Sequence, residues 1–205
     1  MVRIRLLAPL VAIAVLLGAA SARGGGSTGV VVGQLFAGGG NAGAPYTNDF
    51  VELFNRGAAP VDLDGWTLQY ASAAGTTWQA TPLAGTLAVG GHYLLQLAST
   101  AAVGAVLPAP DATGTTNLAV SGGKVALVRD ATPLTCGAAP GSCSAVASVE
   151  DVLGYGTASD YEGTGPASAP TATSALVRAG GGCTDSDDNA ADFSAAPPDP
   201  QNSSS

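Results

Sequence analysis

Two neighbouring stretches decide the fold: Thr47-Asn48-Asp49-Phe50-Val51-Glu52-Leu53-Phe54-Asn55-Arg56-Gly57 and Val61-Asp62-Leu63-Asp64-Gly65-Trp66-Thr67-Leu68-Gln69-Tyr70. The first predicts a strand that ends in a polar turn, and the second predicts a strand that follows the Asp64-Gly65 turn. Trp66, Leu68 and Tyr70 alternate with polar residues, so they share one face of the second strand. We expect this face, with Trp66 at its start, to be buried between two sheets.

The rest of the chain repeats this pattern of short apolar runs. Gly, Pro, Asn and Asp clusters separate the runs, and no stretch after Ala22 keeps the apolar spacing of a helix. This arrangement is typical of antiparallel sandwiches in which each strand packs one face on the core. Strands are expected at Val30–Phe36, Asp49–Asn55, Gly65–Ala71, Thr76–Ala80, His92–Ala98, Asn117–Val120, Lys124–Arg129, Ser148–Gly154 and Ser174–Arg178.

Several further motifs follow the first two in a characteristic order. They are Leu83–Leu95, Lys124–Val128, Val152-Leu153-Gly154-Tyr155-Gly156 with Tyr161-Glu162-Gly163, and the closing Gly182–Phe193. Together they resemble the lamin-tail domain, found in nuclear lamins and in many secreted bacterial proteins. The resemblance covers roughly Val30 to Ser203. It implies an all-β, immunoglobulin-like β-sandwich of the lamin-tail type, with long Gly-rich loops. It also implies a binding or scaffolding module rather than an enzyme.

The first segment has the pattern of a secretory signal peptide. Arg3 and Arg5 precede the apolar run Leu6–Leu17, and Ala20-Ser21-Ala22 fits a cleavage site. The run is shorter than the roughly 20 residues that span a membrane, although an uncleaved anchor is the alternative. We therefore expect a secreted protein, extracellular or periplasmic after cleavage near Ala22. The expected divisions are a signal peptide at 1–22, a flexible linker at 23–29, a lamin-tail-like β-sandwich domain at 30–194 and a Pro/Ser-rich C-terminal tail at 195–205.

The charge balance disfavours some classes of partner. The chain has seven basic and fifteen acidic residues, and loss of Arg3 and Arg5 leaves five against fifteen, a formal charge of 5 − 15 = −10. Such a surface repels nucleic-acid phosphates and anionic lipids. We expect no nucleic-acid partner and no membrane span in the mature chain. An unknown protein or cell-envelope partner is expected, and the sequence does not define the oligomeric state.

The three cysteines predict one disulfide bond in an exported chain. Cys136 and Cys143 flank a turn that contains Gly and Pro, so they are the expected pair. Cys183 would then be free, buried or paired between chains. A bond from Cys183 to one of the other two is the alternative. Closing such a short loop stabilises the fold by about 2 kcal/mol in the chain-entropy model.

Candidate catalytic groups are few. His92 is the only histidine, and its place within an apolar strand pattern predicts a histidine on the solvent face. A zinc site would need more His or Cys ligands than the chain has. Glu52 lies between Phe50 and Phe54, and we expect it to form a structural ion pair with Arg56, Arg129 or Arg178. No catalytic residue is predicted from this set.

Two carboxylate pairs, Glu150/Asp151 and Asp160/Glu162, are the other candidates, because a glycosidase needs two carboxylates about 5–10 Å apart. Successive residues of a strand face opposite ways. We therefore expect one member of Glu150/Asp151 to face solvent and the other to bind a backbone group or an arginine.

One cluster has metal-ligand chemistry. Asp185-Ser186-Asp187-Asp188-Asn189 presents hard oxygen atoms at alternate positions, which suits Ca²⁺, and the candidate ligands are Asp185, Asp187 and Asn189. The segment is not an EF-hand, because Ala190 replaces the turn glycine and Ala196 the closing glutamate. The favoured alternative is an Asx-rich turn whose side chains cap backbone N–H groups. No other cofactor is predicted.

These observations lead to three hypotheses about function. The first is a secreted, non-enzymatic binding or scaffold module of the lamin-tail type. The second is an accessory domain for a secreted nuclease- or phosphatase-like hydrolase, such as many multidomain lamin-tail proteins contain. The third is an intrinsic hydrolase that uses the loop carboxylates. We favour the first, since the sequence offers one histidine and no activated nucleophile.

Overall fold

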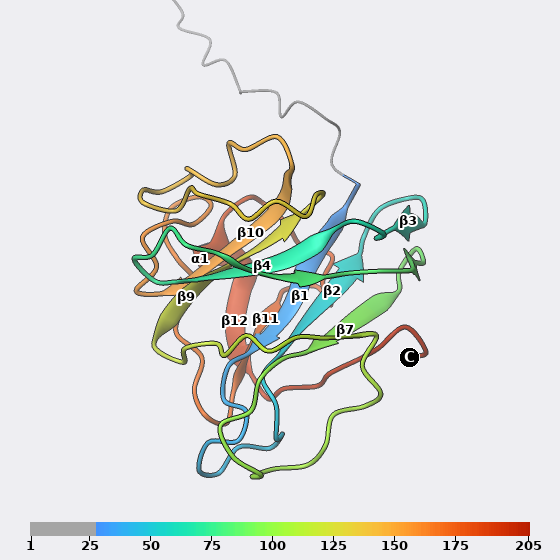
Figure 1. Cartoon of the computed structure of the whole chain (residues 1–205), viewed down its shortest axis with the longest axis vertical. Helices are drawn as coiled ribbons and strands as arrows, with labels where there is room; N and C mark the ends of the chain where they lie inside the picture. The colour runs from blue at the N-terminus through green and yellow to red at the C-terminus, as the bar shows by residue number, and fades with distance from the viewer. Residues whose placement is uncertain (1–27) are drawn as a thin grey trace, which may run out of the picture.

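The computed structural model describes residues 28–205, and it shows an all-β sandwich of two packed sheets (Figure 1). The only helix of this region is the single turn α1 (Asn189–Asp192). No helix within residues 28–205 has the length and apolar character needed to cross a membrane. The predicted signal peptide at 1–22 lies outside the described residues. The predicted all-β, immunoglobulin-like class is confirmed.

The larger sheet has six strands, and the smaller sheet has four. In spatial order, the larger sheet comprises β12 (Phe193–Ala196), β11 (Ala175–Arg178), β1 (Val30–Phe36), β2 (Phe50–Asn55), β7 (His92–Gln96) and β8 (Ala112–Thr113). The smaller sheet comprises β10 (Val149–Gly156), β9 (Gly122–Val128), β4 (Thr67–Ser72) and β5 (Gln79–Pro82). A two-stranded ladder joins β3 (Val61–Asp62) to β6 (Thr86–Leu87). The β7–β8 pair alone is parallel among these pairings.

Most predicted strands are present. β1 has the predicted bounds, and β2, β4, β7, β9, β10 and β11 differ from theirs by a few residues. The prediction of a strand at Asn117–Val120 was wrong. This segment forms no ladder, and Leu118 N–H donates instead to Asp49 Oδ2 at 2.9 Å. The strands β3, β6, β8 and β12 were not predicted; β3, β6 and β8 have only two residues each, too few to show an alternating pattern.

The central core lies between the two sheets. The predicted alternating faces contribute Leu68, Tyr70, Tyr93, Leu95, Val125 and Leu127 to it, as expected. The prediction for Trp66 was wrong, because this residue precedes β4 and is only partly buried against the core. The tryptophan that is buried is Trp78, at 5% exposure, and it belongs to a second cluster on the outer face of the smaller sheet.

Long loops cover the outer faces of both sheets. Ala44 and Leu107, from two loops, pack with Phe36, Phe50 and Leu94 on the larger sheet. On the smaller sheet, the segment between β9 and β10 contributes Leu134 and Cys143 to the cluster that contains Trp78, Ala126, Val128 and Val152. Strands β1, β2 and β9 are consequently buried along their whole length. The expectation that strands pack only one face on the core was therefore wrong for these strands.

The C-terminal segment continues along the larger sheet. β12 pairs with β11 through Ala196, so the ladder runs past the predicted domain boundary at residue 194. The chain then runs from β12 towards the β7 side, where the C-terminus lies (Figure 1). Pro200 is buried on the way. The segment is thus packed along the surface of the sandwich.

Candidate functional site

The residues proposed for Ca²⁺ have other partners in the structure. Asp185 accepts hydrogen bonds from Arg56 Nη1 at 2.8 Å and from Arg178 Nη1 at 3.0 Å. Asn189 is buried; its Oδ1 accepts from Gly154 N–H at 2.8 Å, and its Nδ2 donates to Val152 O at 2.9 Å. The bonds of Asn189 are of the kind expected for the alternative, a turn whose polar side chains bind backbone groups, whereas Asp185 binds two arginine side chains. Ca²⁺ binding here remains a prediction.

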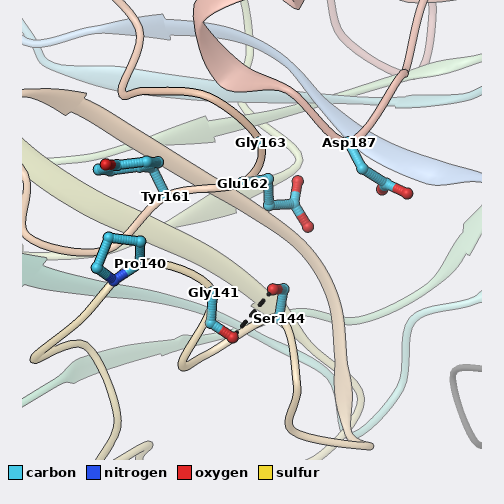
Figure 2. Close-up of a pocket in the computed structure, with 7 residues that line it drawn as sticks. All are labelled: Pro140, Gly141, Ser144, Tyr161, Glu162, Gly163 and Asp187. Carbon is cyan, nitrogen blue, oxygen red and sulfur yellow. Dashed lines mark hydrogen bonds between the residues drawn. The ribbon is translucent and has the colours of Figure 1, made fainter. Parts of the chain in front are cut away.

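Asp187 lies apart from these bonds, at a shallow cavity of about 290 Å³ (Figure 2). Its φ of 55° is in the left-handed region that non-glycine residues rarely adopt. The cavity is lined by Pro140, Gly141, Ser144, Tyr161, Glu162, Gly163 and Asp187. The buried Glu162 comes from the loop after β10, whereas Asp187 precedes α1, so two separate segments each bring one carboxylate to the cavity.

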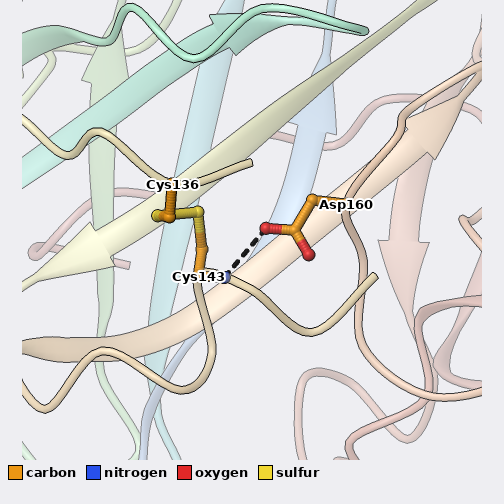
Figure 3. Close-up of side chains that lie close together, drawn as sticks. All are labelled: Cys136, Cys143 and Asp160. Atoms are coloured by element: carbon orange, nitrogen blue, oxygen red, sulfur yellow. Dashed lines mark hydrogen bonds between the residues drawn. A yellow bond between two sulfur atoms is a disulfide. The ribbon is translucent and has the colours of Figure 1, made fainter. Parts of the chain in front are cut away.

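The predicted Cys136–Cys143 disulfide is confirmed, with a Cα–Cα distance of 5.2 Å (Figure 3). Cys183 is free and exposed. Asp160, completely buried, lies beside the disulfide and accepts hydrogen bonds from Cys143 N–H at 2.9 Å and Ser142 N–H at 3.0 Å. The two sulfur atoms and a carboxylate oxygen of Asp160 lie within 4.8 Å of one another. Because the sulfurs are bonded to each other, they offer no thiolate to a metal, and Asp160 holds the loop in place.

Lys124, in β9, also binds the loop that carries the disulfide. Its side chain is buried, and Nζ donates to Gly75 O and Gly137 O, both at 2.7 Å, and to Ser159 Oγ at 3.1 Å. Burial lowers the pKa of Lys124, and the charge of Asp160 opposes this shift. All three ammonium hydrogens thus have acceptors from three different loops.

The expectation that one member of Glu150/Asp151 faces solvent was wrong, because both side chains are buried, whereas the expected partner of the other member, a backbone group or an arginine, is found for Asp151. Asp151 Oδ2 accepts from Val32 N–H at 2.6 Å and lies 2.9 Å from Arg178 Nη2. Glu150 accepts from Thr28 Oγ1 at 2.8 Å and lies 3.6 Å from Arg129 Nε. The register between β10 and β9 shifts between Val149 and Asp151. Such a bulge breaks the strict alternation that the prediction assumed.

Arg178 connects several elements through one buried guanidinium. Nε donates to Val32 O at 2.8 Å, Nη1 lies 3.4 Å from Asp192 Oδ2, and the guanidinium carbon lies 4.5 Å from the centre of the Phe193 ring. Burial lowers the pKa of Arg178, but the nearby carboxylates, Asp151 first, outweigh it and raise the pKa overall. Arg178 therefore stays charged. Burial raises the pKa of Asp151, and the charge of Arg178 opposes that shift.

A groove on the outer face of the larger sheet contains Glu52 and His92. The predicted ion pair of Glu52 with an arginine was wrong: Glu52 Oε1 lies 2.8 Å from His92 Nδ1. His92 is only partly exposed, and its ring packs 5.0 Å from that of Phe54. These three residues line a cavity of about 330 Å³, and another wall is formed by the C-terminal residues Ala196, Pro197, Asp199 and Gln201.

Side chains of the sheet contact the backbone of the C-terminal segment in this groove. Gln34 makes two bonds to one residue: Asp199 N–H donates to Oε1 at 2.9 Å, and Nε2 donates to Asp199 O at 3.0 Å. Gln201 N–H donates to Glu52 Oε2 at 2.7 Å. Ser203 N–H donates to Asp111 Oδ2 at 3.1 Å. Sequence reasoning did not select Gln34, although it is the one polar side chain of the apolar β1 run, a signal of a residue with a buried partner.

The comparison with protein families agrees with this architecture. The description Lamin Tail Domain matches residues 25–142. The chain belongs to the lamin-tail domain family. No match was found among curated proteins. The matched region of this lamin-tail chain includes β1 to β9, while β10, β11 and β12 follow it and complete the two sheets. The lamin-tail domain is a non-enzymatic immunoglobulin-like fold, which agrees with the coarse functional expectation.

Proposed function

We propose that this lamin-tail chain is a secreted, non-enzymatic binding or scaffold module whose partner is a protein or a component of the cell envelope. The observation that carries the proposal is the use of its buried carboxylates. Asp151 binds Arg178, Asp160 binds the disulfide loop, and Glu52 binds His92 and the C-terminal backbone. Each of these groups holds the fold together, whereas a hydrolase needs carboxylates directed at a substrate.

Two features support export. The disulfide is of a kind that persists in oxidising compartments. The sequence of residues 1–22 has the basic, apolar and small-residue regions of a signal peptide. N-terminal sequencing of the protein recovered outside the producing cell tests this part of the proposal. We expect the mature chain to begin near Arg23, and recovery only in the cytoplasm with Met1 intact would contradict export.

Activity and partner assays test the rest. The purified mature chain is incubated with nucleic acid, phosphoester, peptide and glycoside substrates, and we expect no turnover. In parallel, the chain with a photo-crosslinker at an exposed position such as Val106 is applied to the exported fraction, where we expect a discrete crosslinked product. Turnover that Glu52→Gln or Asp160→Asn abolishes, without loss of the fold, would contradict the proposal.

A further inference from the structure

We propose that the groove formed by β1, β2 and β7 is a recognition site for an extended, proline-containing polypeptide segment of a partner protein. In the structure, the chain's own residues 198–205 occupy this site. The inference rests on the proposed function and deepens it, because it names the surface and the chemical class of the partner. Three observations carry it: the contacts to the backbone, the burial of one proline and the charge of the groove.

Most of the contacts are to the backbone of the segment, although two come from its side chains: Asn202 Nδ2 donates to Ala109 O, and Ser203 Oγ donates to Asp111 Oδ1. Gln34 binds the N–H and the carbonyl oxygen of Asp199, as a neighbouring strand would. Glu52 and Asp111 each accept a backbone N–H, from Gln201 and Ser203. The bonded groups of Asp199 and Gln201 belong to alternate residues, which is the spacing on one side of an extended chain. The segment then turns, and Ser205 N–H donates to Asn202 O at 3.0 Å. Any segment that offers the same backbone groups can make these bonds.

Pro200 is the one buried residue of the segment from Pro197 to Ser205. Asp199 and Ser203, by contrast, are exposed residues. Pro200 has no N–H to satisfy, and its ring favours the extended conformation on both sides. Its two neighbours, Asp199 and Gln201, line the cavity together with the apolar residues Phe54, Val177 and Pro197. The pattern recognised is therefore an extended residue, a proline, and free N–H groups at the first and third positions after the proline.

The occupant is not the best match for the charge of the groove. It brings no large apolar side chain, and each hydrogen bond contributes only about 0.5–1.5 kcal/mol net. The sheet contributes one carboxylate to the cavity, Glu52, whose Oε1 lies 2.8 Å from His92 Nδ1. Asp199 of the chain's own segment adds a second carboxylate to the same cavity, and like charges repel. A partner segment with a neutral or basic residue before the proline avoids this repulsion. Such a segment can displace the C-terminal residues.

The test uses the full chain with its own segment released. Gln201→Pro and Ser203→Pro together remove the two N–H donors that Glu52 and Asp111 accept, and both positions lie outside the strands. The probe is a fluorescein-labelled peptide with the sequence of residues 196–205, followed by fluorescence anisotropy. Ser204→Pro is the matched control, because Ser204 N–H bonds only locally, to Asn202 Oδ1. Near-ultraviolet circular dichroism checks the fold, and amide exchange checks that the segment has left the groove.

We expect the double variant to bind the peptide at least tenfold more tightly than the unaltered chain or the Ser204→Pro control does. Adding Gln34→Ala should remove this gain, whereas Gln79→Ala, at an exposed glutamine of β5, should not. A peptide with Lys in place of Asp199 should bind more tightly than the original peptide at low salt. Equal affinity for the double variant and the unaltered chain would overturn the assignment. A segment that stays docked in the double variant would also overturn it.

Exchange of the C-terminal segment between two copies is the competing occupant. Light scattering of the unaltered chain across concentrations distinguishes it, and a dimer that the double variant loses would overturn the assignment to a partner protein. The groove assignment can fail while the proposed function holds. If the unaltered chain forms a crosslinked product in the exported fraction but the released groove binds no peptide, the chain is a binding module that uses another surface.

Discussion

Asp151 of β10 and Arg178 of β11 form a buried ion pair that joins the smaller sheet to the larger one. The Oδ2–Nη2 distance is 2.9 Å, and the exposed fractions of the two side chains are 3% and 0%. A buried ion pair adds little net stability over an apolar pair, but loss of one partner leaves an uncompensated charge. The pair therefore determines how the sheets fit together more than how stable they are, and both ions must be present.

Arg178→Met should lower the free energy of unfolding by about 3–5 kcal/mol, because Asp151 and Asp192 would remain buried without a cation. Guanidinium unfolding at neutral pH measures this loss. Arg56→Met is the matched control: Arg56 makes a partly exposed pair with Asp185, and its loss should cost less than about 1 kcal/mol. Equal losses in both variants would contradict the role assigned to Arg178.

Asp49 should make the fold less stable as the pH rises through the weakly acidic range. Burial raises the pKa of Asp49 to about 6, although the N–H groups of Leu118 and Gly39 oppose the shift. The folded chain then binds a proton that the unfolded chain, with an aspartate pKa of about 3.9, has released. The stabilisation is complete below about pH 4 and is lost as the pH rises through about 6, an effect of about 3 kcal/mol.

Chemical unfolding of the unaltered chain and of Asp49→Asn at pH 4 and pH 7 checks this prediction. Other carboxylates titrate alike in both proteins, so the difference between the two pH dependences isolates Asp49. We expect the unaltered chain to lose more stability than the variant between these pH values. An identical pH dependence would show that Asp49 does not carry a raised pKa.

Loss of the disulfide should cost about 2 kcal/mol while leaving its loop in place. Cys136→Ser with Cys143→Ser removes the covalent closure of a short loop. Asp160 and Lys124 still bind backbone groups of that loop, so near-ultraviolet dichroism should change little. Asp160→Ala should be the more damaging change, because it leaves buried N–H groups without acceptors. If the serine double variant proves the less stable of the two, the covalent bond dominates.

Calcium should not stabilise the chain through Asp185, Asp187 and Asn189, because Asp185 and Asn189 are bound to arginines and backbone groups. Differential scanning calorimetry with millimolar Ca²⁺ or with chelator measures this. A site that binds only the folded chain would add about 2.7 kcal/mol at a hundredfold excess over Kd. A Ca²⁺-dependent rise in melting temperature that Asp187→Ala erases would establish the calcium site instead.

The sequence predicts those parts of this fold that depend on local pattern. β1 and the alternating faces of β4, β7 and β9 follow from apolar spacing within a few residues. The groove does not, because Gln34 and Asp199 are 165 positions apart, and neither has a local signal for the other. The bulge at Glu150 likewise depends on the partner strand β9. Trp66 has the right period but lies before the ladder begins, so its burial could not be judged from alternation alone.

The central claim is that side chains of the larger sheet hold the C-terminal backbone in a recognition groove. Amide hydrogen exchange at Gln201 and Ser203 in the full chain tests it most directly. We predict that both amides are protected, and that Gln34→Ala removes this protection while amides of β1 and β2 keep theirs. Unprotected Gln201 and Ser203 amides in the unaltered chain, or protection that Gln34→Ala leaves unchanged, would contradict it.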